Sequence, residues 1–288
     1  MNIWLFICAI FVTNICSGNE IKWHPGHYIL VADDTSQKNF IHPKFLGIQK
    51  RYYWNNLEPK KDVYDFSEIK SDLFYLEKYE KRLVVQIQTK SFKKDITYAP
   101  DYLRGPEYGG GIFKSDTGAF NPVYWNTEVS KRLNALYTNL GRELDKEPYL
   151  EAVVLPETAL GYIVPKIGVE SYNVDKYIVS LKSGMKALKD AFPNTVVIQY
   201  TNFPLDDLEE LTNYEKEIGV GLGGPDVAPY SPSLTNIKKG IYRFYPKLSG
   251  IIPLGAAVQY PDYTWKKTEK TPKELRDDYI WKTGEEVS

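Results

Sequence analysis

The sequence predicts an α/β fold of parallel strands joined by helices. From Tyr28 onward, short runs rich in β-branched residues alternate with longer amphipathic segments, a pattern typical of helical crossovers between parallel strands. The length of 288 residues suits one large core, because a single β/α barrel takes about 250 residues. No glycine-rich phosphate loop follows the first strand, which argues against a doubly wound sheet. We therefore predict a (β/α)8-type TIM barrel.

The predicted strands and helices alternate along the chain. The strands are expected at residues 27–32, 45–54, 83–89, 150–155, 195–202, 220–226 and 251–260, and the helices at 66–82, 126–147, 174–192, 205–219, 233–247 and 271–283. In the first helix, apolar residues recur at helical spacing, and Asp65 or Ser67 is expected to cap it. Gly219 is expected to stop the fourth helix, and Pro272 lies near the first turn of the last.

Two features of this plan are unusual. The segment from Lys90 to Tyr124 is rich in glycine and proline, and it is longer than a simple connection requires, so we expect a functional loop there. The second feature is that an eighth strand is missing, so that the barrel is predicted to be incomplete, with seven strand–helix units. A fragment or truncated gene product would explain this, because an open barrel exposes two strand edges.

The N-terminal segment is interpreted as a targeting signal. Residues 1–18 contain an apolar run, from Ile3 to Val12, that is too short to span a bilayer. Ser17 and Gly18 offer a cleavage point, although the usual basic region is missing, so a cleaved signal is favoured over an anchor. We therefore expect a secreted or periplasmic protein whose single domain spans residues 19–288, with no stable membrane insertion after cleavage.

Composition excludes several classes of function. The net charge of −1 gives no reason to expect a nucleic-acid partner. The two cysteines, Cys8 and Cys16, fall in the signal segment, so the mature chain would have no disulfide and no thiolate nucleophile. The three histidines, His24, His27 and His42, lack a usual metal spacing, so neither a metal nor a cofactor is expected. The 23 tyrosines and 6 tryptophans suit a sugar cleft, because flat rings stack on pyranose faces.

The predicted site lies at the carboxyl ends of the strands, where TIM barrels carry their active sites. Ala152–Leu155 is a continuous apolar run, which indicates a strand buried on both faces, and Glu157 follows directly. A carboxylic acid at an apolar strand end acquires the raised pKa that a general acid needs. The side chains collected at the other strand ends include Arg51, Trp54, Lys90, Tyr200, Asn202, Asp226, Gln259, Tyr260 and Asp262.

Two segments resemble a known family. Residues 51–69, RYYWNNLEPKKDVYDFSEI, resemble the second-strand segment of TIM-barrel glycoside hydrolases, the β-galactosidase-like and related bacterial families, where Arg and Trp precede an LEP–x–G–x–YDF stretch. In those enzymes a glycine stands in the place of Asp62. PETAL, residues 156–160, resembles their fourth-strand site, with Glu157 at the acid/base position and Pro156 replacing an Asn. The resemblance covers residues 27–270 in strand order, and only these two motifs are specific.

The resemblance implies hydrolysis of a β-linked glycan by two carboxylates, with Glu157 as acid/base. The family's nucleophilic Glu follows strand seven, where this chain has Gln259, so Asp262 or Asp226 is the expected partner carboxylate. Sugar contacts are expected from the side chains of Arg51, Trp54, Tyr200, Asn202, Gln259 and Tyr260.

Three functional hypotheses stay open. A hydrolase is favoured. Gln259, the missing eighth strand and Pro156 support the alternative of a catalytically inactive barrel that binds carbohydrate. A barrel enzyme of different chemistry, such as a lyase, is the third hypothesis; a metal requirement would favour it, and the scarcity of histidine argues against it.

Overall fold

The computed structural model describes residues 21–31, 41–161, 170–228 and 231–258. The predicted signal segment 1–18 and the predicted helix 271–283 lie outside these ranges. In the described part, no helix is both long enough and apolar enough to cross a membrane.

Seven parallel strands form one sheet, as predicted. They are β1 (Tyr28–Val31), β2 (Gly47–Tyr53), β3 (Arg82–Gln88), β6 (Leu150–Leu155), β7 (Val196–Tyr200), β8 (Gly221–Gly224) and β9 (Leu254–Ala256). The spatial order β1-β2-β3-β6-β7-β8-β9 follows the chain, and every neighbouring pair is parallel. The strand–helix alternation seen in the sequence therefore has the predicted topology.

The sheet curls into a partial barrel, and one hydrogen bond demonstrates the curvature. The Gln49 side chain on β2 donates to the Tyr200 hydroxyl on β7 at 2.9 Å, although β3 and β6 lie between these strands. In a flat sheet, three strand spacings of about 4.8 Å would separate them. Both side chains therefore lie on a concave face, where Val84, Ala152, Val154 and Val196 also form an inner cluster. The chain has the α/β architecture of a TIM barrel, incomplete in its described part.

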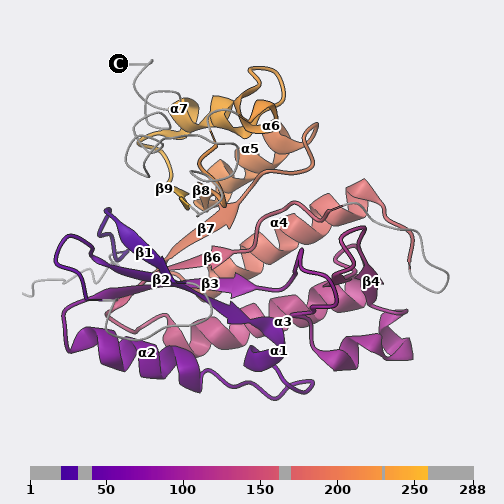
Figure 1. The fold of residues 1–288 in the computed structure, drawn as a ribbon, viewed down its shortest axis with the longest axis horizontal. Helices are drawn as coiled ribbons and strands as arrows, with labels where there is room; N and C mark the ends of the chain where they lie inside the picture. Colours follow the sequence, from indigo (N-terminus) through magenta and orange to yellow (C-terminus); the bar gives the residue numbers. More distant parts are fainter. Residues whose placement is uncertain (1–20, 32–40, 162–169, 229–230, 259–288) are drawn as a thin grey trace, which may run out of the picture.

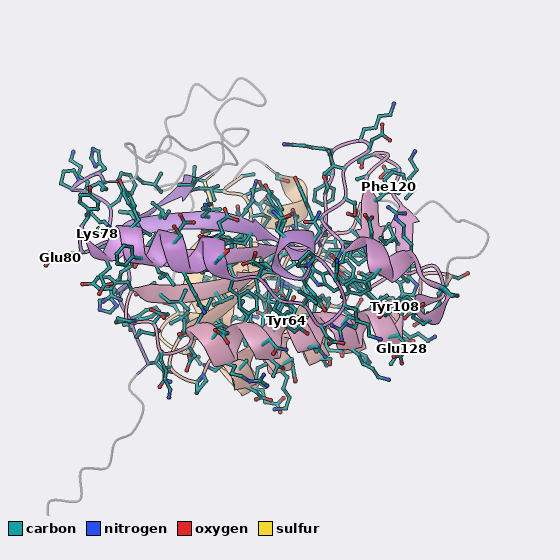
Figure 2. All side chains as sticks on the ribbon, turned by 90° about the horizontal axis from the view of Figure 1, so that it is seen from below. Tyr64, Lys78, Glu80, Tyr108, Phe120 and Glu128 are labelled. Carbon is teal, nitrogen blue, oxygen red and sulfur yellow. The ribbon has the colours of Figure 1, made fainter. Side chains whose placement is uncertain are left out.

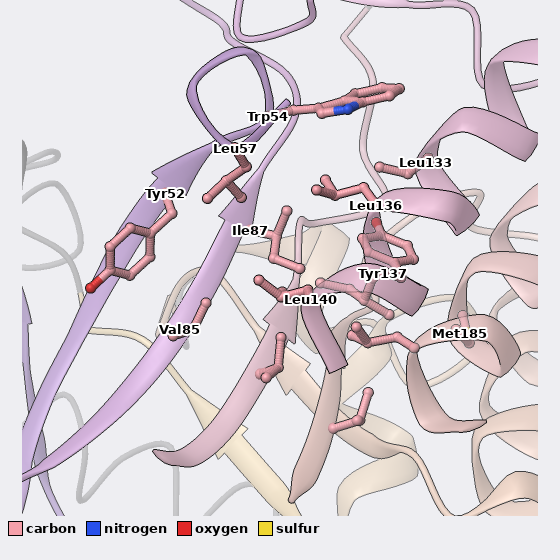
Figure 3. Close-up of a cluster of buried hydrophobic side chains, with 14 of the residues drawn as sticks. Tyr52, Trp54, Leu57, Val85, Ile87, Leu133, Leu136, Tyr137, Leu140 and Met185 are labelled. Atoms are coloured by element: carbon pink, nitrogen blue, oxygen red, sulfur yellow. The ribbon is translucent and has the colours of Figure 1, made fainter. Parts of the chain in front are cut away.

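Helices cover the convex face of the sheet (Figure 1). The longer ones are α2 (Ser67–Glu77), α3 (Thr127–Leu144), α4 (Val174–Ala191) and α5 (Leu208–Ile218), and the short ones are α1 (Trp54–Leu57), α6 (Pro232–Thr235) and α7 (Tyr245–Leu248). Figure 3 shows Val85 and Ile87 of β3 facing Leu136 and Leu140 of α3, with Met185 of α4 beside them. All five are buried in the main apolar cluster.

Side-chain caps fix the starts of the two longest helices. Asn126 accepts hydrogen bonds from the backbone N–H groups of Glu128 and Val129, and Asn173 caps α4 in the same way. The predicted stop at Gly219 is confirmed, because this residue ends α5 with a φ of 70°.

The expected cap of α2 is wrong. Phe66 occupies the N-cap position without a side-chain hydrogen bond. The Asp65 carboxylate instead accepts from the backbone N–H of Ser67 at 2.9 Å, which is a local turn before the helix.

The predicted helix at residues 233–247 is also wrong. The chain forms three short pieces there, α6, a 3-10 turn at Ile241–Phe244, and α7. Gly240 is extended, with φ −77° and ψ 151°, which interrupts the helix. Pro246 lies in the first turn of α7, where its missing N–H costs nothing.

The long loop after β3 contains structure that the sequence did not predict. It holds two 3-10 turns, Asp101–Arg104 and Pro106–Tyr108, and an antiparallel hairpin of β4 (Ile112–Lys114) and β5 (Phe120–Pro122). Figure 2 shows Phe120 of this hairpin at one end of the molecule, and Lys78 and Glu80 at the other. Since Lys78 and Glu80 immediately precede β3, the hairpin lies toward the carboxyl ends of the strands.

Candidate functional site

Glu157 lies where the sequence predicted, two residues after the end of β6. The Asn202 side chain, which follows β7, donates a hydrogen bond from Nδ2 to Glu157 Oε2 at 2.8 Å. The Asn202 Oδ1 atom accepts from the backbone N–H of Ala159 at 2.9 Å. One amide therefore orients the carboxylate and holds the backbone beyond it. Glu157 and Asn202 were both predicted as site residues, and the structure brings them into contact.

The backbone that follows Glu157 is fixed by Thr158, which is completely buried. Its hydroxyl oxygen accepts from the N–H groups of Asn202 and Phe203 at 3.0 and 2.8 Å. Its carbonyl accepts from the hydroxyl of Tyr177, on α4, at 2.6 Å. The two strand ends are thus joined by side-chain bonds and covered by a helix, so that Glu157 is held on a rigid support.

Lys90 is the other charged group next to Glu157. It follows β3 and is 1% exposed, and its Nζ donates a hydrogen bond to the backbone carbonyl of Glu157. Burial lowers the pKa of the Lys90 ammonium to about 8, against the opposing attraction of the Glu157 charge. Its Nζ lies 5.7 Å from the centre of the Tyr124 ring. Lys90 therefore belongs to the site as a cation enclosed by protein.

A second polar group lies on the concave face, around Tyr200. Gln49 bonds both the Tyr200 hydroxyl and, at 2.9 Å, the Gln86 side chain. Burial raises the pKa of the Tyr200 hydroxyl to about 12; Gln49 and the positive charge of Arg51 lower it, and the negative charge of Asp226 raises it. Arg51 and Asp226 therefore both lie within electrostatic reach of Tyr200. The structure gathers these predicted site residues from β2, β7 and the end of β8.

Trp54 does not serve as a sugar platform in this structure, which corrects its predicted role. The side chain is 0% exposed, and its indole N–H donates to the Glu58 carboxylate at 2.9 Å. Glu58, also fully buried, is paired with the Arg132 guanidinium of α3. This part of the second-strand motif therefore anchors the segment after β2 to α3.

Asp62, which stands where the resembling family has glycine, has a structural explanation. Its φ is 62°, in the left-handed region that glycine adopts most easily and that Asp tolerates better than most residues. Its carboxylate accepts a hydrogen bond from Arg132 Nη1 at 2.7 Å, and its backbone N–H donates to Glu58 at 3.1 Å. The local ion pair thus offsets the strain of a side chain at this position.

Other predicted residues fall outside the described ranges or away from the site. Gln259, Tyr260 and Asp262 belong to the segment 259–288, which the structure does not describe. His24 pairs with Glu151 at 2.9 Å, at the opposite end of β6 from Glu157. Among the described residues, no group of three or more His, Cys, Asp or Glu side chains is arranged to hold a metal ion.

Asn121, on the hairpin, was missed by the sequence reasoning. It is completely buried, and its side chain bonds both the N–H and the carbonyl of Ser91 at 2.8 and 3.0 Å. It therefore links β5 to the residue that follows Lys90. An asparagine in a loop has no pattern that would have marked it, because its partner is 30 residues away in the chain.

Several solved structures resemble this chain at low sequence identity. An exo-β-1,4-mannosidase from Opitutaceae bacterium strain TAV5 superposes with a TM-score of 0.50 and 10% identity, over 83% of this chain and 44% of that one. A β-galactosidase from Rahnella sp. R3 has a TM-score of 0.48 and 10% identity, over 69% of this chain and 39% of that one. Endo-glycoceramidase II from Rhodococcus sp. has a TM-score of 0.43 and 9% identity, over 75% of this chain and 64% of that one. This chain thus spans less than half of the first two. No family profile and no curated protein matches the sequence. At this identity the likeness to the mannosidase supports the barrel fold alone.

Proposed function

We propose that this protein is a secreted glycoside hydrolase that cleaves a β-linked glycan. The main support is the position of Glu157 at the carboxyl end of β6, the fourth parallel strand. Its carboxylate is hydrogen-bonded to Asn202, which follows the neighbouring strand β7. This strand end is where the resembling family has its acid/base. Secretion rests on residues 1–18, and it is tested by sequencing the N-terminus of the exported protein, which should begin at Asn19.

Two carboxylates would carry out the reaction. Glu157 would protonate the oxygen of the leaving sugar, while Asn202 keeps its carboxyl group oriented. Asp226 or Asp262 would act from the other side of the scissile bond. A carboxyl separation of about 5 Å gives retention through a covalent intermediate, and one of about 6.5–9.5 Å gives inversion through a water molecule. The chemistry requires neither metal nor cofactor.

Substrate contacts are proposed on the concave face. The Arg51 guanidinium and the Asp226 carboxylate would take part, since both charges act on the Tyr200 hydroxyl. Tyr200 itself would bond a sugar hydroxyl, as would Gln259 and Tyr260 at the end of the seventh strand. Trp54 is not included among these contacts, because its ring is buried.

A second candidate function is a catalytically inactive barrel that binds carbohydrate. The observation that favours it is Gln259, because an amide has the shape of the family's nucleophilic carboxylate without its charge. Such a protein would bind oligosaccharides through the same concave face without turning them over.

The test is hydrolysis of a panel of chromogenic β-glycosides by the purified full-length chain, compared with Glu157→Gln. Glu151→Gln is the matched control, because Glu151 is a buried glutamate at the other end of the same strand. Hydrolysis that Glu157→Gln abolishes and Glu151→Gln retains supports the proposal. If the folded wild type binds oligosaccharides in calorimetry without hydrolysing any glycoside, the protein is a binding barrel.

A further inference from the structure

Lys90 is a buried cation that the proposed hydrolysis does not use. It is 1% exposed, and its ammonium donates to the backbone carbonyl of Glu157. Removing an ammonium from water is costly, so a buried one needs hydrogen-bond acceptors and a compensating charge. Glu157 supplies both, through its carbonyl oxygen and through the attraction of its carboxylate.

The backbone around Lys90 is held on both sides. The hairpin residue Asn121 bonds the N–H and the carbonyl of Ser91. On the other side, the hydroxyl groups of Thr89 and Tyr124 share a hydrogen bond of 2.6 Å. The residues on both sides of Lys90 are thus held by hydrogen bonds, and its side chain reaches Glu157 from a fixed backbone.

Lys90 and Glu157 are the charged pair among the ionisable groups around the Lys90 ammonium. Among the described residues, Glu157 is the charged group that acts on the ammonium. The hydroxyl groups of Tyr124 and Tyr177 lie in the same region, and burial raises the pKa of both above its ordinary value, so they stay neutral near pH 8. Near pH 8, the titration within this cluster therefore belongs to Lys90.

We propose that Lys90 is a positioning residue for Glu157. Its ammonium fixes the peptide group that carries this side chain, and it provides a positive charge in the interior beside the carboxylate. Asn202 holds the carboxylate itself, so the two residues fix different parts of Glu157, the backbone and the side chain. This inference rests on the proposed function of Glu157 and adds a residue on which its position depends.

The kinetic test compares Lys90→Met with Lys50→Met in the full-length chain, on an aryl β-glycoside that the wild type hydrolyses. Lys50 is a partly buried lysine that pairs with Asp72 of α2 at 2.6 Å. We expect Lys90→Met to lower kcat by about 100-fold, the cost of a misplaced catalytic group, with KM changed less than about threefold. The wild-type rate should decline above pH 8, and this decline should be absent in Lys90→Met.

A second measurement does not depend on turnover. The Lys90 ammonium is titrated by NMR of ¹³C-lysine-labelled protein, in the wild type and in Glu157→Gln. Loss of the neighbouring negative charge should lower the pKa of Lys90 by about one unit or more. An unchanged titration overturns the proposal, as does a Lys90→Met variant with wild-type kcat and pH profile. If no glycoside is hydrolysed but Lys90 responds to Glu157, the proposed function fails and the charge coupling is supported.

Discussion

Raising the pH from 7 to 10 should strengthen the contribution of Lys90 to stability. The pKa of its ammonium is lowered by burial from 10.5 to about 8 in the folded chain. Between these two values the unfolded chain keeps a proton that the folded chain has released, so unfolding takes up protons and the free energy of unfolding rises with pH. Below pH 8 the folded protein bears the full cost of the buried charge, and this cost is relieved as the pH rises toward 10.5.

The size of the effect follows from the shift. The lowering of the Lys90 pKa from 10.5 to about 8 corresponds to about 3 kcal/mol, at about 1.36 kcal/mol per unit. Most of this free energy should appear between pH 7 and pH 10, and the remainder is lost because the unfolded lysine begins to titrate before its own pKa is reached. Lys90 is completely buried, so screening by solvent does not reduce this value.

The assay is urea unfolding of the wild type and of Lys90→Met at each pH. Subtracting the variant removes the titration of every other group, and the difference in unfolding free energy isolates Lys90. Lys50→Met is the control with the opposite sign. Burial lowers the pKa of Lys50, but the Asp72 and Glu68 carboxylates outweigh burial and raise it overall. The contribution of Lys50 should therefore stay level below pH 10 and be lost only above that pH.

A difference between wild type and Lys90→Met that stays level from pH 7 to pH 10 would refute this reasoning. It would mean that Lys90 titrates alike in the folded and unfolded chain, and hence that its ammonium is solvated. A difference that falls with pH would mean that attraction by Glu157 exceeds the cost of burial.

Three further outcomes are expected in chemical unfolding experiments. Asp62→Gly should change the unfolding free energy by less than about 1 kcal/mol, because glycine relieves the positive φ as the Arg132 pair is lost, whereas Asp62→Ala should cost about 1–2 kcal/mol. Gly141→Ala should destabilise by about 1–3 kcal/mol despite better helix propensity, because its Cβ would lie 2.3 Å from the Ala191 carbonyl oxygen. Burial raises the pKa of Glu215 well above its ordinary value of 4.5, so the folded protein loses stability as the pH rises above 4.5. Replacing this carboxyl group by an amide in Glu215→Gln should therefore increase the free energy of unfolding more at pH 8 than at pH 5.

Much of the fold could be predicted because its signals are local. The apolar run of β6 marks a strand buried on both faces, and Asn126 starts α3 at the expected position. The hairpin of β4 and β5 could not be predicted in this way. Its strands are three residues each, and they are held partly by Asn121, whose partner Ser91 is distant in the chain. The broken helix at 233–247 failed because an amphipathic pattern continued across Gly240.

The site was predictable where it depends on strand ends, and unpredictable where it depends on side-chain contacts between them. Glu157 and Asn202 end neighbouring strands, so topology alone brings them together. The sequence predicted Lys90 only as one of the side chains at the strand ends. Its role in the site depends on the direction of its side chain, and the 1% exposure of Lys90 and its contact with the Glu157 carbonyl show that it is buried rather than solvated.

The two motifs that resemble glycoside hydrolases therefore carry different information. In the second-strand motif, Trp54 and Glu58 are buried, and with Arg132 they join the β2 segment to α3. This motif is explained by the barrel itself, so its presence is equally compatible with an active and an inactive protein. The fourth-strand motif is different, because a rigid support that presents a carboxylate at a strand end is not needed to stabilise the fold. The decision between hydrolase and binding barrel thus rests on Glu157 and on the partner carboxylate. Asp226, whose charge acts on Tyr200, is the described residue on which to test it first.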